Sequence, residues 1–341
     1  MNALRDPRRG KKLSALSFVA FAALAAGCAP SFDPPSEIQT LRVLAVQKDR
    51  PYAFPGEDVT LSMLWHDAKA APGRTVQRAW IGGCVNPPAD LYQGCFSIFA
   101  ADPASVTFEL DGDDEFTVTI PDDVVRQRQP GQYSYGLSYV FFAVCAGTIE
   151  LAPEQEGLPL RCVSDAGQVL GADDFVVGYT AIYSFEEFGN ANPIVTGFQF
   201  QGQDVTEDCI DLACLDAPIV EPTNCDQEGA PCVPACPEDG EPECQKYQVM
   251  PVVSMDSVEP DEVSAATYDA DFMEQIWINY YVDHGSISPS AKLVNDATKG
   301  WNPEQQGDFR APKDPGPAAV WAVVHDNRGG VSFARFTISV Q

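Results

Sequence analysis

Cysteine is the most informative of the potentially reactive residue types in this sequence, which has eleven cysteines and only three histidines. Setting Cys28 aside leaves ten, and an even number in a chain made for an oxidising compartment predicts five disulfides and no free thiol. We expect Cys84 to pair with Cys95 and Cys145 to pair with Cys162, because each pair would close a short loop of the first half.

The other six cysteines lie within 36 residues of the second half. This segment has no aromatic residue, lysine or arginine but six prolines and nine carboxylates, so we expect disulfides to replace a hydrophobic core there. The sequence does not choose among their pairings. A metal site is the alternative, although no histidine lies nearby and the spacing is not the paired CxxC of structural zinc sites. The six are Cys209, Cys214, Cys225, Cys232, Cys236 and Cys244.

No common catalytic motif accompanies the histidines. The sequence lacks HExxH, GxSxG, the P-loop and the Rossmann glycine pattern. His66, His284 and His325 are therefore predicted to be strand-end or turn residues rather than general bases. We expect a non-catalytic protein, and a hydrolase of envelope polymers is the competing class.

Calcium is the small ligand that the carboxylates suggest, and no other cofactor is expected. Four aspartates lie in turns or near predicted strand ends, where oxygen ligands could converge. The EF-hand spacing is not met, and turn chemistry alone also selects aspartate and glycine, so a solvated turn is the alternative at each position. The four candidates are Asp111, Asp113, Asp283 and Asp326.

Four tryptophans offer a second binding hypothesis, because exposed indole rings could line a platform for a sugar. The alternative is that they belong to the core, as a tryptophan in a strand usually does. They are Trp80, Trp277, Trp301 and Trp321.

The first 28 residues have the pattern of an export signal. Five basic residues precede an apolar run over residues 13–27, which is too short to span a bilayer. The run ends in LAAGC at Cys28, which resembles the lipobox of bacterial lipoproteins. The resemblance implies that residues 1–27 are removed and that Cys28 is diacylated. Arg8-Arg9 does not continue into the twin-arginine pattern, so general secretion is expected.

The lipid implied at Cys28 would anchor the chain to a membrane without a spanning helix. Ala29 stands where lipoproteins retained in the inner membrane often carry Asp, so the resemblance implies the outer membrane, on a side that the sequence leaves open. Residues 28–37 contain three prolines and are predicted to form an extended tether.

Charge excludes one class of partner. The sequence has 21 Lys and Arg against 49 Asp and Glu, a net charge of −28, and removal of residues 1–27 would leave −32. Such a surface repels a phosphate backbone, so no nucleic-acid partner is expected. The expected partners are the membrane, through the lipid, and a protein or polysaccharide in the envelope or outside the cell.

Short β-branched and aromatic runs separated by Pro, Gly and Asp predict an all-β fold. Residues alternate between apolar and polar along several runs, so each sheet should bury one face against a second sheet. The predicted strands cover residues 41–47, 58–65, 77–82, 116–120, 133–145, 175–185, 194–201, 247–255, 275–282, 318–325 and 331–340.

The closing segment 319–340 resembles the last hairpin of bacterial immunoglobulin-like and PKD-like domains, with a V-x-D-x-x-G-G turn over residues 324–330. Asn327 and the glycine pair 329–330 are expected to supply the positive φ angles of the turn. The P-G-x-x-V pattern at residues 55–59 resembles a turn of the same folds.

The resemblance implies two tandem sandwiches, over residues 38–188 and 189–341, with the boundary in the turn-rich segment 189–193. The second sandwich carries the cysteine-rich insertion 203–246. From the sequence, this insertion is either a recognition element or protease-resistant decoration.

Overall fold

A computed structural model describes the chain from Pro34 onward with short gaps, and residues Pro35–Gln341 form one compact unit. The predicted signal peptide, Cys28, most of the tether and Asp111 lie outside the described residues. The described ranges are 34–101, 106–110, 112–128, 135–152, 157–205, 208–210, 214, 219, 225–226, 229–237 and 244–341.

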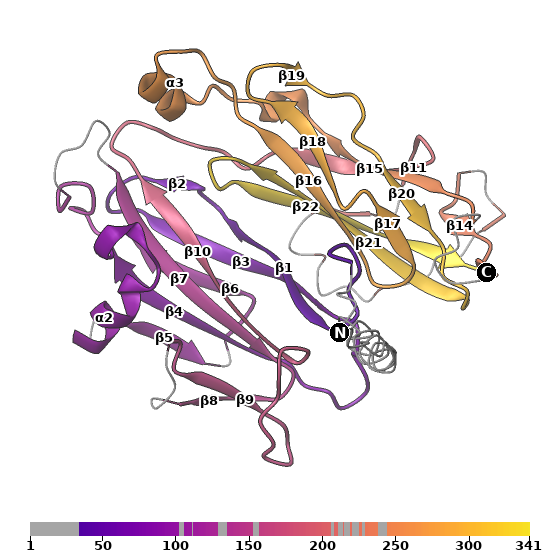
Figure 1. Cartoon of the computed structure of the whole chain (residues 1–341), viewed down its shortest axis with the longest axis horizontal. Coiled ribbons are helices and arrows are strands. Elements are labelled where there is room, and N and C mark those ends of the chain that lie inside the picture. Colours follow the sequence, from indigo (N-terminus) through magenta and orange to yellow (C-terminus); the bar gives the residue numbers. More distant parts are fainter. Residues whose placement is uncertain are drawn as a thin grey trace, which may run out of the picture. The chain divides into compact units, whose positions relative to one another are not determined.

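The prediction of an all-β fold is confirmed, and two sheets account for most of the first half (Figure 1). One has the order β1-β3-β6 and the other the order β2-β10-β7-β4-β5. Apolar side chains from the facing sides form their common core, in which the stacked rings of Trp80 and Phe116 lie 5.6 Å apart. The strands are β1 (Leu41–Lys48), β2 (Tyr52–Ala53), β3 (Asp58–Asp67), β4 (Gln77–Val85), β5 (Thr107–Leu110), β6 (Glu115–Thr119), β7 (Gly136–Cys145) and β10 (Phe175–Ser184).

The second half also has two sheets, with the orders β12-β11-β15-β20-β17 and β13-β22-β21-β16-β18-β19. Phe198, Phe309 and Phe336 are buried in the core between them. The strands are β11 (Val195–Phe200), β12 (Gln203–Asp204), β13 (Asp208–Cys209), β14 (Cys232–Val233), β15 (Tyr247–Val253), β16 (Ile276–Val282), β17 (Ser286–Ser288), β18 (Ala291–Asp296), β19 (Gly300–Trp301), β20 (Gly307–Arg310), β21 (Gly316–Asp326) and β22 (Val331–Val340).

Short elements outside these sheets were not predicted from the sequence. The hairpin β8 (Thr148–Leu151) and β9 (Leu160–Val163) fills the excursion that the second disulfide closes. Its residues and those of helix α2 (Gly94–Ala101) pack on the outer face of the five-stranded sheet. The remaining elements are the 3₁₀ turns η1 (Pro88–Asp90) and η4 (Met255–Ser257) and the helix α3 (Glu262–Tyr268).

A third apolar cluster joins the two halves. Alternation along β3 turns Met63 into the core of the first half and Leu64 toward the second. Leu64 and Leu44 share a buried cluster with Trp321 and Phe333, which lie on the face of β21 and β22 turned away from the core of their own half. Both faces of these two sheets are therefore packed, while the boundary at residues 188 and 189 stays a prediction.

The structure contains five disulfides, and all ten cysteines considered above belong to one of them. The expected pairs Cys84–Cys95 and Cys145–Cys162 are present, with Cα atoms 5.4 and 5.6 Å apart. The other six pair with their neighbours along the chain, as Cys209–Cys214, Cys225–Cys232 and Cys236–Cys244.

The cysteine-rich insertion is more closely joined to the fold than its composition suggests. Asp208–Cys209 pairs with β22 in an antiparallel manner, and Cys232–Val233 pairs with its end in a parallel manner. Val233 is only 2% exposed and lies in the core of the second half. The disulfides expected in place of a hydrophobic core are present, and two short strands in addition bring Val233 into the core of the second half.

Candidate functional site

The turn between β21 and β22 is formed by other interactions than the sequence predicts. Gly329 has a positive φ of 91°, but Asn327 and Gly330 are not among the described residues with positive φ. Instead, the Asp326 carboxylate accepts hydrogen bonds from the backbone N–H groups of Arg328, at 2.8 Å, and Gly330, at 2.7 Å. Gly330 is required because a Cβ there would clash with this carboxylate. The turn is thus closed by a side chain rather than by three left-handed residues.

Arg328 points from this turn into the interior, where its side chain is only 4% exposed. Its Nε donates to Glu274 at 2.6 Å and its Nη2 donates to Glu259 at 2.6 Å. Burial raises the pKa of Glu274 to about 7, although the charge of Arg328 and its hydrogen bond oppose the rise. The guanidinium also lies over the ring of Tyr52, 5.7 Å from its centroid, and so contacts the first half.

A second buried cation faces the same turn. Lys48, at the end of β1, donates from Nζ to the carbonyl of Ala181 on β10, at 2.9 Å. Burial lowers the pKa of Lys48 to about 8, against the attraction of Asp326. The segment between the halves adds the side chain of Asn192, which donates to the carbonyl of Lys48 at 2.7 Å and accepts from the N–H of Val331 at 2.9 Å.

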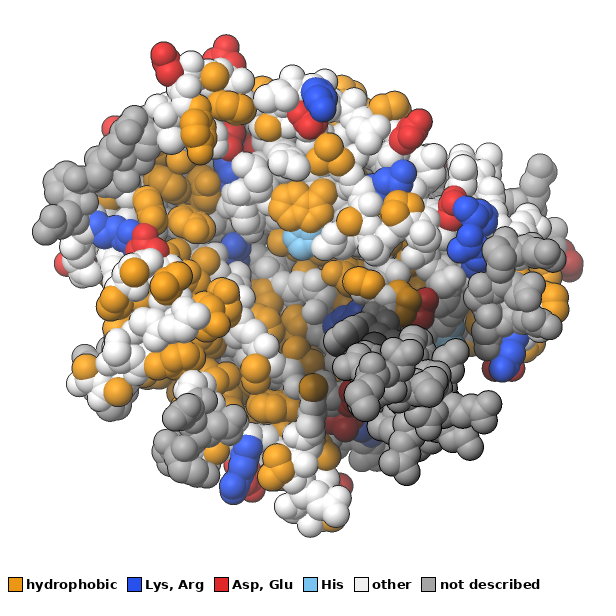
Figure 2. Space-filling model, viewed as in Figure 1, with side chains coloured by type: hydrophobic (Ala, Val, Ile, Leu, Met, Phe, Trp, Pro, Cys, Tyr) orange, Lys and Arg blue, Asp and Glu red, His pale blue; other side chains and the backbone are white. Residues whose placement is uncertain are grey.

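These buried charges form the floor of a cavity of about 640 Å³ between β10 and the ends of β16 and β21. Its walls are rich in aromatic rings from both halves. We define the aromatic groove by Tyr52, Tyr135, Tyr179, Tyr183, Trp277 and His325. Figure 2 shows hydrophobic side chains gathered over β10 and the neighbouring strands of the first half.

Strand β10 positions two of these rings. Tyr179 and Tyr183 are four residues apart and so lie on the same face of the strand, with the small Ala181 between them. They are 46% and 38% exposed, respectively. Tyr135 is fixed beside them by its hydroxyl, which donates to the Asp90 carboxylate at 2.6 Å, while the guanidinium of Arg128 lies 4.5 Å from its ring centroid. Tyr135 is therefore held in place before any ligand arrives.

The second half contributes a stacked pair to the groove. Trp277 on β16 and His325 on β21 are directly opposite each other, and their rings stack with centroids 5.2 Å apart. Burial lowers the pKa of His325 to about 4, so the imidazole is neutral at pH 7. Its buried Nε2 has no hydrogen-bond partner among the described residues. The groove thus presents rings and hydroxyls, which is an arrangement suited to holding a ligand.

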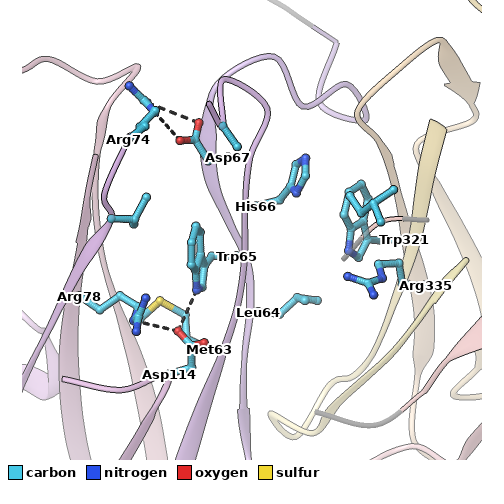
Figure 3. A pocket seen from close by; sticks show the side chains of 13 residues that line it. Met63, Leu64, Trp65, His66, Asp67, Arg74, Arg78, Asp114, Trp321 and Arg335 are labelled. Carbon is cyan, nitrogen blue, oxygen red and sulfur yellow. Dashed lines mark hydrogen bonds and ion pairs between the residues drawn. The ribbon is translucent and has the colours of Figure 1, made fainter. Parts of the chain in front are cut away.

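A second cavity, of about 410 Å³, lies beside β3 (Figure 3). Four of its charged residues form two pairs, Arg74 with Asp67 and Arg78 with Asp114 at 3.0 Å, and Arg335 donates to the carbonyl of Cys214 at 3.3 Å. The indole N–H of Trp65 also donates to Asp114, at 2.8 Å. Because these pairs satisfy each other, this cavity offers a ligand less than the aromatic groove does.

His66 and Asp283 form a polar contact between the halves. His66 Nε2 lies 3.4 Å from an Asp283 oxygen, and the imidazole packs 4.6 Å from the ring of Trp321. Burial opposes ionisation of Asp283, but hydrogen bonds from His284, His66 and the N–H of Ala319 outweigh it and lower its pKa to about 2. Of the three histidines, His66 thus serves a packing contact, His284 borders Asp283, and His325 lines the groove.

The structure does not bring the calcium candidates together. Asp326 accepts hydrogen bonds from backbone N–H groups of its own turn. Asp283 accepts hydrogen bonds from two histidines and a backbone N–H, and Asp113 is exposed. Among the described residues, no group of three or more His, Cys, Asp or Glu side chains could hold a metal ion. These aspartates therefore act in turns and between strands, while Asp111 lies outside the described residues.

The sequence suggested Trp277 as part of a sugar platform and His325 only as a strand-end or turn residue, and it gave no role to the tyrosines that line the groove. Trp80 and Trp321 are almost fully buried, as the core interpretation of strand tryptophans predicts, and Trp301 packs against the core of the second half. Tyr179 and Tyr183 share one face of a predicted strand, and this even spacing was the available signal. Tyr52 and Tyr135 have no such signal, because only the tertiary fold brings them to β10.

No family model and no curated protein matches this chain. It is weakly similar to solved structures of bacterial alpha-2-macroglobulins. For the native E. coli protein the identity is 12% and the TM-score 0.22, over 89% of this chain and 16% of that chain. For two Salmonella structures, a single-residue variant and a form reacted with methylamine, the identities are 14% and 12% and the TM-scores are both 0.20. This chain spans about a sixth of those proteins, and such scores identify neither a fold family nor a function.

Replacing Arg328 tests how much its buried ion pairs stabilise the fold. We expect Arg328→Met to lower the free energy of unfolding by about 3–5 kcal/mol, because Glu274 is left buried without its partner. Arg50→Met is the matched control, since Arg50 forms an exposed pair with Glu57 and its loss should cost less than about 1 kcal/mol. Urea denaturation followed by circular dichroism measures both, and equal effects would contradict this role of Arg328.

Asp283 predicts a pH dependence of stability. Its pKa is lowered in the folded state, so its contribution is complete above about pH 4 and is lost as the pH falls through about 2. Asp283→Asn should remove this part of the acid denaturation curve and cost about 2 kcal/mol at neutral pH. The control Asp308→Asn breaks an exposed pair with Lys246 and should leave the curve nearly unchanged. An unaltered acid curve for Asp283→Asn would refute the assignment.

Proposed function

We propose that this chain is a non-catalytic lipoprotein of the bacterial cell envelope, which binds another envelope or extracellular molecule through the aromatic groove. The observation that carries the binding role is the groove itself, a cavity of about 640 Å³ lined by rings. Tyr179 and Tyr183 keep a large part of their surface in water. Concave sites with apolar walls and a few placed polar groups are the usual form of binding sites, and exposed apolar patches commonly mark contact surfaces.

The non-catalytic part of the proposal is supported by the titratable groups of the groove. A general base works best when its pKa lies near the working pH. The pKa of His325 is about 4, and the two groups with pKa values nearer to 7, Lys48 and Glu274, are each hydrogen-bonded to a partner within the protein. Lys48 and Arg328 are committed to Ala181 and to buried carboxylates. Their charges therefore stabilise the floor of the groove, and the rings are left to contact the ligand.

The anchoring part of the proposal rests on residues 1–28. The basic residues, the apolar run and the LAAGC sequence resemble a lipoprotein signal, which implies diacylation of Cys28 and, by Ala29, the outer membrane. Among the described residues, no helix has the length and apolar character needed to cross a membrane.

We also propose that both pairs of sheets are of the immunoglobulin-like type, with the boundary near residue 189. Two features support this type. Each half packs two sheets face to face around its own core. The last two strands, β21 and β22, pair along their length and are joined by the V-x-D-x-x-G-G turn.

Labelling with palmitate tests the anchor. In a Gram-negative host, the full-length protein should incorporate labelled palmitate and sediment with membranes. We expect Cys28→Ser to lose the label and to move to the soluble fraction, while Ser31→Ala, a change three residues away, should behave as the parent. A Cys28→Ser protein that keeps the label or the membrane location would refute the anchor.

Photo-crosslinking in intact cells tests the groove. A diazirine amino acid in place of Ala181, which lines the groove between Tyr179 and Tyr183 on the same face of β10, should give a discrete adduct. The adduct should fall at least about fivefold when Tyr183→Ala is added, because a truncated anchor typically costs more than 1 kcal/mol of binding. It should persist with Tyr268→Ala, a change at a tyrosine that is 70% exposed and outside the groove. An adduct that survives Tyr183→Ala would contradict the binding role.

A further inference from the structure

We infer that the ligand of the aromatic groove is an uncharged glycan, which stacks on the tyrosine rings and hydrogen-bonds to His325. This inference rests on the proposed function, because it names the chemical class that the same groove binds.

The spacing of the rings carries the first step. The ring of Tyr183 lies 5.7 Å from that of Tyr135 and 6.3 Å from that of Tyr52, and Tyr52 lies 4.7 Å from Phe185. Rings at these distances already contact one another, so they form a continuous surface rather than a row of slots. The rings are tilted by 48–61° to one another, so the surface is faceted, and a sugar ring can stack on the face of an individual ring.

This spacing argues against an extended proline-rich peptide. A proline ring held between two aromatic rings needs optimal carbon contacts of about 3.5–4.0 Å on each side, which places the rings about 7–8 Å apart. All three separations above are smaller. A pyranose ring needs no slot, because its C–H groups carry partial positive charge and are attracted to the negative face of an aromatic ring.

Charge carries the second step. The sequence has a net charge of −28, which disfavours a polyanionic ligand at any site that lacks free cations. Both cations that line the groove already form hydrogen bonds within the protein. Lys48 donates to the carbonyl of Ala181, and Arg328 donates to Glu274 and Glu259. The one lining carboxylate, Asp326, is 2% exposed and accepts from backbone N–H groups. The groove is thus a neutral surface on an acidic protein, and an uncharged ligand fits it.

His325 carries the third step. His325 lines the groove, and its buried Nε2 has no hydrogen-bond partner in the part of the chain that the structure describes, which costs about 1–3 kcal/mol. A ligand reaches this nitrogen when the imidazole turns toward the groove. A neutral imidazole nitrogen either accepts or donates, according to its tautomer. A sugar hydroxyl can take either role, so it would satisfy this nitrogen in both tautomers. The flat indole of Trp277, stacked on the imidazole, adds a further ring beside it.

Isothermal titration of the full-length protein in detergent tests the inference. The probes are cellohexaose, maltohexaose and the hexamer of N-acetylglucosamine, with polygalacturonate as an anionic glycan and decaproline as a peptide. We expect at least one neutral hexasaccharide to bind with a dissociation constant below about 1 mM. Tyr183→Ala should weaken it at least about tenfold and Tyr268→Ala should not, because only Tyr183 lies in the groove.

Tryptophan fluorescence gives a second readout that does not depend on loss of affinity. Binding should change the emission of the parent, and Trp277→Phe, which keeps a ring in the groove, should remove most of that change while binding persists. His325→Phe should weaken binding at neutral pH, since it keeps the stack but removes the nitrogen.

The outcomes separate this inference from the proposed function. If no neutral glycan binds, or if Tyr183→Ala leaves binding unchanged, the glycan inference is overturned. Binding of decaproline or polygalacturonate that Tyr183→Ala abolishes would likewise overturn it, while preserving the groove as a binding site. Failure of the proposed function itself would appear in the crosslinking experiment, as an adduct that does not depend on Tyr183.

Discussion

Arg328 carries a full positive charge into the interior where β21 turns into β22, and both halves of the chain are arranged around it. Burying an ion is costly unless its partners are close and its hydrogen bonds are complete. Here two carboxylates, Glu274 and Glu259, supply the partners, and the carbonyls of Gly189 and Pro260 lie within 3.4 Å. These groups come from three separate segments, so each must be in place for the charge to be tolerated.

The same turn explains how the first half is held. Asp326 accepts from the Asn190 side chain at 3.1 Å and attracts the buried Lys48 of β1. The bonds of Asn192 to β1 and to Val331 complete the connection. The turn-rich segment that the sequence predicts as the boundary is therefore held by the hydrogen bonds of two asparagines. Together with the apolar cluster of Leu64 and Trp321, this polar network gives the halves a fixed contact rather than a hinge.

A preformed groove follows from that contact. Its rings come from β2, β10 and the segment before β7 in the first half, and from β16 and β21 in the second. A groove assembled from both halves keeps its shape only if the halves do not move, and preorganisation of this kind reduces the entropic cost of binding. The buried turn thus has a functional consequence, because it holds the walls of the groove together.

Much of the fold could be predicted from the sequence, because the long strands alternate apolar and polar residues in a way that only a half-buried strand requires. The short strands β13 and β14 could not, since two residues carry no period and their pairing with β22 depends on the folded insertion. The local disulfide Cys84–Cys95 was predicted by spacing. The groove was visible only in part: Trp277 and His325 stood out as rare residue types, whereas Tyr52 and Tyr135 reach the site through contacts distant in sequence.

Differential scanning calorimetry of the full-length protein tests most directly whether the buried turn makes one unit of the two halves. The compact unit Pro35–Gln341 is expected to unfold in a single transition, with a calorimetric enthalpy equal to the van't Hoff enthalpy. Two separate transitions, each with the enthalpy of about half the chain, would show that the halves are independent and that the groove between them is not preformed.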